Sequence, residues 1–85
     1  MPKLMEGGIV VPQSAKQFAD RLNKGLDELD VPAVVRERVT ILSKMLQIPK
    51  QQAWNLLEGY QLPDEQLLQQ IANELEVETG WLVGK

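Results

Sequence analysis

The chain has 85 residues, the size of one small domain, and it contains neither cysteine nor histidine. These absences exclude disulfides and thiolate or imidazole metal sites, and they remove the commonest general base. We therefore expect a protein that is not an enzyme, with no catalytic residues, metal, cofactor or small-molecule substrate. No apolar run approaches the roughly 18–20 residues of a membrane span, so we expect a cytoplasmic protein without membrane contact.

Charge is distributed unevenly along the chain, whose net charge is −3. Residues 1–50 hold eight basic and six acidic residues, whereas residues 51–85 hold one basic and six acidic residues. The span Arg36–Lys50 alone carries a net charge of +3. An acidic total disfavours a nucleic-acid partner, but a local basic cluster of this kind is what phosphate binding requires.

Proline, glycine and apolar spacing predict an arm followed by one helical domain. Residues 1–13 contain two prolines and two glycines without sustained periodicity, which predicts a flexible N-terminal arm. Residues 14–85 show helical periodicity and are expected to form the domain. Its first helix ends before Asp30-Val31-Pro32, because proline disfavours helix in the residue that precedes it. The expected inner face of this helix consists of Phe18, Leu22, Leu26 and Leu29.

Three further helices and a final helical turn are expected. The second helix covers about residues 34–46, and the third covers about 50–58, with Gly59 placed to end it. A fourth starts at Leu62-Pro63-Asp64, and a last short helix near 79–83 seats Trp81 in the core. The predicted class is all-α, a compact domain of four to five helices. In the second helix, the inner face is Val35, Val39, Leu42 and Leu46, while Arg36, Glu37, Arg38 and Lys44 project elsewhere.

Residues 38–59 have the length of a helix-turn-helix and its order of a helix, a short break and a second short helix. In that motif the second helix enters the major groove of DNA. At about 100° per residue, the third helix turns its apolar side chains to the core and its amides away from it. Outward amides can bond adenine and lysine can reach guanine. The expected core set is Ala53, Leu56, Leu57 and Tyr60; Gln51, Trp54, Asn55 and Glu58 lie opposite, with Lys50 and Gln52 on the flanks.

The chain also resembles a known family. Residues 36–59, the Trp81-Leu82 pair and the Phe-Ala-Asp-Arg-Leu-Asn run at 18–23 resemble the phage-repressor-like (lambda-repressor-like, XRE-type) helix-turn-helix domains over about residues 14–85. The resemblance implies a repressor-like transcription regulator of a prokaryote or phage. It implies that Lys50, Gln51, Gln52 and Asn55 read bases, and that Arg36, Arg38 and Lys44 contact phosphates.

Four positions depart from the family pattern, and the first is Ser43, which stands where alanine is common. Val39 stands where a phosphate-contacting glutamine is common, and Gln47 stands where the turn often has glycine. Trp54 replaces a small or polar residue and has three open interpretations: packing at the core edge, contact with a protein, or contact with DNA. The net acidity, Trp54 and the missing glutamine at Val39 favour an alternative in which the fold is kept but binds a protein partner.

The sequence therefore predicts a sequence-specific DNA-binding transcription regulator whose third helix enters the major groove of double-stranded DNA. One short helix contacts few base pairs, so we expect a homodimer on paired half-sites. The expected dimer contact lies at residues 81–84. The alternative function is a protein–protein interaction module with weak or no DNA binding.

Overall fold

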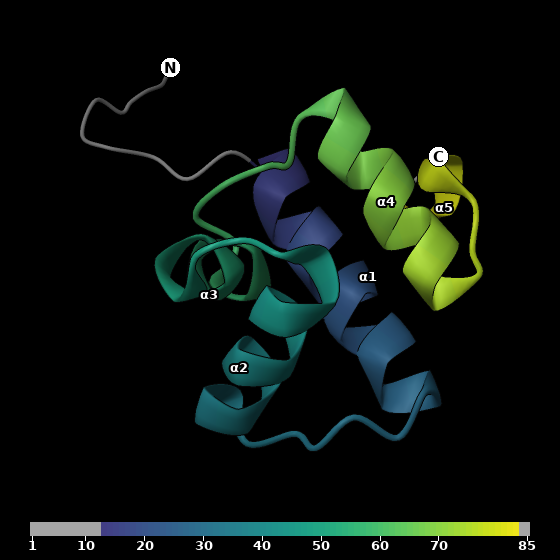
Figure 1. The fold of residues 1–85 in the computed structure, drawn as a ribbon. Helices are drawn as coiled ribbons and strands as arrows, with labels where there is room; N and C mark the ends of the chain where they lie inside the picture. Colours follow the sequence, from purple (N-terminus) through teal and green to yellow (C-terminus); the bar gives the residue numbers. More distant parts are fainter. Residues whose placement is uncertain (1–12, 84–85) are drawn as a thin grey trace.

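The computed structural model describes residues 13–83, and all statements about structure below concern these residues. The expected arm at residues 1–13 lies outside them except for the backbone of Gln13. The described chain folds into five helices and has no strand, as the predicted all-α class requires (Figure 1). The helices are α1 (Gln13–Glu28), α2 (Val35–Leu46), α3 (Lys50–Glu58), α4 (Glu65–Leu75) and α5 (Thr79–Leu82). None of them is long and apolar enough to cross a membrane.

Helix α1 contributes the largest side chains of the core. Phe18, Leu22 and Leu26 are fully buried, as their spacing predicts. The prediction that Leu29 continues this face is wrong, because α1 ends at Glu28 and Leu29 is exposed in the turn that follows. The next residue, Asp30, adopts a left-handed conformation, with φ 62°, that carries the chain away from the helix axis.

Helix α2 packs against α3 and turns Val39, Leu42 and Leu46 into the core. The prediction that Val35 joins them is wrong, since its side chain remains 46% exposed. Val35 is the first residue of α2. Because this end of α2 extends past the core, the side chain of Val35 is exposed to solvent although it lies on the inner face of the helix.

The turn between α2 and α3 is short and held by hydrogen bonds. Gln47 adopts the left-handed conformation, with φ 57°, at the end of α2. The Ser43 hydroxyl donates to the carbonyl of Ile48 at 2.6 Å, and the backbone N–H of Ile48 donates to the carbonyl of Ser43 at 3.1 Å. Pro49 is the N-cap of α3. These bonds fix the direction in which α3 leaves α2.

The second half of the chain closes the core. Gly59 ends α3 with φ 83°, as predicted, and a Cβ there would lie only 3.2 Å from the Cα of Lys16 in α1. Asp64 caps α4 by accepting a hydrogen bond from the backbone N–H of Leu67 at 2.8 Å. Trp81, expected in the core, is half-buried and packs at its edge. The core therefore draws on all five helices.

Candidate nucleic-acid interface

Arg38, predicted to project from α2 toward phosphates, is buried and only 4% exposed. Its guanidinium donates to the carboxylate of Asp27 at 2.7 Å and to the side-chain oxygen of Asn23 at 2.9 Å. It also donates to the carbonyls of Val31 and Pro32, at 2.8 and 3.0 Å. The prediction is wrong because the loop between α1 and α2 folds over this side of the helix. Arg38 holds that loop and is not a candidate for contact with a ligand.

The remaining basic residues of the predicted phosphate set stay on the surface. Arg36 and Lys44 are exposed, and Lys50 is exposed at the first turn of α3. Arg36, Thr40 and Lys44 follow one another at intervals of four residues and therefore lie on one side of α2. Within residues 13–83, the single ion pair joins Arg38 to Asp27, so these three cations have no acidic partner there.

The outer side of α3 carries a short chain of amides. The Gln51 amide donates to the side-chain oxygen of Asn55 at 3.2 Å, and the Asn55 amide donates to Gln61 at 3.2 Å. Gln51 is exposed and Asn55 is half-buried. We call Lys50, Gln51, Trp54 and Asn55 the reading face. The side-chain amides of Gln51 and Asn55 are oriented by these two hydrogen bonds. A ligand that bonds to the amides would replace those hydrogen bonds.

Gln52 is separated from the reading face. It is half-buried and lines a hollow of about 270 Å³ together with Gln47, Asp64 and Gln70. This hollow lies between the α2–α3 turn and the start of α4. The structure therefore brings together Lys50, Gln51 and Asn55 of the predicted base-reading set and leaves Gln52 on another side of α3.

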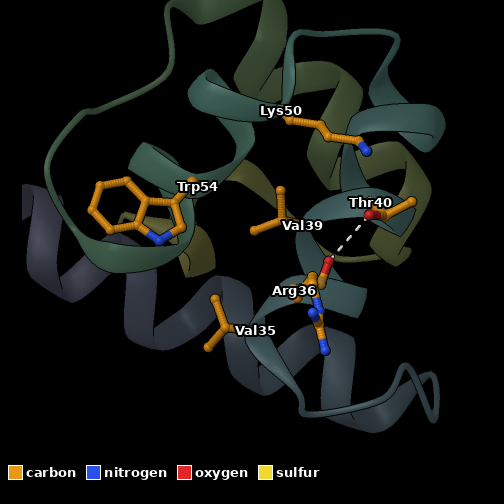
Figure 2. A pocket seen from close by; sticks show the side chains of 6 residues that line it. All are labelled: Val35, Arg36, Val39, Thr40, Lys50 and Trp54. Carbon is orange, nitrogen blue, oxygen red and sulfur yellow. Dashed lines mark hydrogen bonds between the residues drawn. The ribbon is translucent and has the colours of Figure 1, made fainter.

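A groove of about 450 Å³ separates the first half of α2 from α3. Figure 2 shows Val39 at its centre, with Trp54 to one side and Thr40 to the other, Lys50 above and Arg36 below. Val39 and Trp54 make much of the lining apolar, whereas Arg36 and Lys50 place a cation near each end. We call this feature the α2–α3 groove; its lining residues are Val35, Arg36, Val39, Thr40, Lys50 and Trp54.

Trp54 does not pack into the core; it forms one wall of this groove and is 37% exposed. Its ring stacks on Tyr60, with ring centroids 5.2 Å apart and planes inclined by 26°. The prediction that Tyr60 faces the core is wrong, because Tyr60 is 53% exposed. Helical geometry no longer applies to it, since α3 ends at Glu58. The position of Tyr60 directly after the helix-ending Gly59 is the signal that could have shown this.

No family model matches the chain, and neither a curated protein nor a solved structure was found to be similar to it.

Proposed function

We propose that the protein binds double-stranded DNA by placing α3 in the major groove, and that its five helices form a phage-repressor-like helix-turn-helix domain. The observation that carries the proposal is the exposed outer side of α3, with Lys50, Gln51 and Asn55 turned away from the packed core. An α-helix fits the major groove, and amide and lysine side chains match the hydrogen-bonding groups of base edges. The proposed role is regulation of transcription.

Phosphate contacts in this proposal come from Arg36 and Lys44. Both belong to α2, which a short, hydrogen-bonded turn holds against α3. A rigid pair of helices of this kind positions the reading helix against the DNA backbone. Because one α3 helix contacts few base pairs, we propose that two copies occupy half-sites about 34–36 Å apart.

Gln51 and Asn55 provide the test of base reading. A preferred site is first selected from random duplexes, and binding of Gln51→Ala and Asn55→Ala to that site and to unrelated DNA is then measured by fluorescence anisotropy. Each substitution is expected to cost roughly 1–3 kcal/mol on the preferred site and much less on unrelated DNA. Gln69→Ala, which removes an exposed amide from α4, is the matched control and is expected to bind both duplexes as the parent does.

The proposal fails if the parent shows no preference among duplexes. It also fails if Gln51→Ala and Asn55→Ala bind the preferred site as tightly as Gln69→Ala does. Circular dichroism of each variant checks that the helices are retained.

Protein binding at the same face is a second candidate function, because the stacked pair of Trp54 and Tyr60 is exposed. Tryptophan and tyrosine are enriched among residues that dominate protein–protein binding energies. This function is favoured over DNA reading if Trp54→Ala abolishes association with a protein while Gln51→Ala and Asn55→Ala change no activity.

A further inference from the structure

Two exposed large hydrophobic side chains, Val35 and Trp54, line the α2–α3 groove, and a third, Tyr60, stacks on Trp54. In the part of the chain that the structure describes, six such side chains are exposed, and only Leu29 belongs to the turn after α1. The other five begin α2 or belong to α3 and the loop that follows it: Val34, Val35, Trp54, Tyr60 and Leu62. Single exposed apolar residues are ordinary, whereas a concentration of them marks an interaction surface.

The α2–α3 groove specifies the chemistry of its occupant. Val35, Val39 and Trp54 offer apolar surface in a space large enough for at least one whole side chain. Arg36 and Lys50 border the same space and have no ion pair within residues 13–83. A matching partner therefore presents an apolar side chain with a carboxylate close to it.

The loop between α3 and α4 of this same chain has that chemistry. Leu62 is 39% exposed, and the exposed Glu65 follows it three residues later. Asp64 is occupied as the cap of α4, whereas Glu65 makes no ion pair in the described chain. The end of the loop and the first residue of α4 thus combine an uncovered apolar side chain with an available carboxylate.

We propose that the α2–α3 groove binds a second copy of the chain, with the partner's Leu62 in the groove and the partner's Glu65 against Arg36. The stacking of Tyr60 on Trp54 places the start of the loop beside one wall of the groove. In the proposed dimer each loop lies over the partner's groove, so the contact is reciprocal and closes at two copies.

This assembly covers Lys50 and Trp54 and therefore excludes DNA from the reading face. That consequence rests on the proposed DNA-binding function. Two copies on DNA half-sites leave both α3 helices uncovered, so they use a different contact. Self-association through the groove is accordingly a DNA-free form of the protein.

The first test compares Leu62→Ser with Leu29→Ser by sedimentation over a range of protein concentrations. Both variants remove an exposed leucine from a connection between helices, and neither adds charge. Loss of a central apolar anchor is expected to weaken dimerisation about ten-fold or more in Leu62→Ser, and Leu29→Ser is expected to match the parent. The proposal is overturned if the parent stays monomeric up to about 1 mM, a concentration well above the dissociation constants of specific interfaces. Equal weakening by both variants also overturns it.

The second test exchanges charges. Arg36→Glu and Glu65→Arg are each expected to weaken dimerisation, by about two- to five-fold for each exposed pair. The double variant restores a reversed pair across the interface and is expected to recover dimerisation. A double variant as weak as the product of the two single effects overturns the assigned pairing, and thermal unfolding of each variant confirms that α4 is retained.

DNA binding measured on the same samples separates the two proposals. If the parent dimerises through Leu62 but shows no preference among duplexes, the DNA function fails and the second-copy contact stands. If the parent reads DNA but remains monomeric, the second-copy contact fails and the DNA function stands. If both stand, Leu62→Ser binds the preferred duplex at least as tightly as the parent; weaker binding overturns the exclusion of DNA.

Discussion

The two sides of α2 contain the same kinds of residue in opposite states. On the buried side, the Arg38 guanidinium donates five hydrogen bonds, three of them to residues of α1, while Leu42 is enclosed in the core. On the side that faces the groove, Arg36 is exposed without an ion pair in the described chain and Val35 is half uncovered. The side with Arg38 and Leu42 therefore stabilises the fold. The side that faces the groove carries charge and apolar surface that no other part of the described chain covers.

The largest expected effect is at Leu42. It is 1% exposed, so Leu42→Ala leaves a cavity and is expected to lower the free energy of unfolding by roughly 2–5 kcal/mol. Val35→Ala on the groove side is the control and is expected to change it by less than about 0.5 kcal/mol. Urea unfolding followed by circular dichroism measures both. Equal losses would contradict the difference between the two sides.

Arg38 gives the next effect. Arg38→Ala removes a buried charged donor that holds the carbonyls of Val31 and Pro32, and it is expected to cost about 1.5–3 kcal/mol of stability, the range for hydrogen bonds to charged groups. Arg38→Lys is expected to recover only part of this loss, since one ammonium cannot reproduce the fork of donors. Arg36→Ala is the matched control. If chemical denaturation finds Arg38→Ala as mild as Arg36→Ala, the loop between α1 and α2 does not depend on the guanidinium.

A smaller effect is expected for DNA binding at the groove side. Arg36→Ala and Lys44→Ala are each expected to weaken binding about equally on all duplexes and to make the salt dependence shallower by about one unit. Lys24→Ala, an exposed cation on α1, is the control and should leave the slope unchanged. Titrations at several salt concentrations measure the slope. Parent-like slopes in both α2 variants would remove these residues from the interface.

The smallest effect is expected in the turn that joins α2 to α3. Gln47 has φ 57°, a conformation that glycine adopts without the steric penalty of a side chain. Gln47→Gly is therefore expected to raise stability by up to about 1 kcal/mol, the penalty being partly offset by the greater freedom of glycine in the unfolded chain. Thermal unfolding measures the change. A clear loss of stability would show that the glutamine side chain contributes to the turn.

Local sequence determined much of the helical framework. Buried positions at helical spacing, such as Leu42 in α2 and Leu56 in α3, are where the periodicity predicts them. Gly59 and Asp64 end α3 and begin α4 as expected, because a left-handed C-cap and a side-chain N-cap depend on neighbouring residues alone. The placement of Gln51 on the outer side of α3 follows from the same helical geometry.

Only the tertiary structure decided what surrounds each side of a helix. Arg36 and Arg38 both had to leave the apolar stripe of α2, but the loop at 29–34 covers one of them and not the other. The spacing of Val35 and Tyr60 predicts that both face the core, but both are exposed. Val35 lies where α2 extends past the core, and Tyr60 follows the end of α3. Periodicity gives the direction of a side chain around its own helix. Whether that direction meets protein or solvent depends on elements distant in sequence, so the α2–α3 groove became visible only in the folded chain.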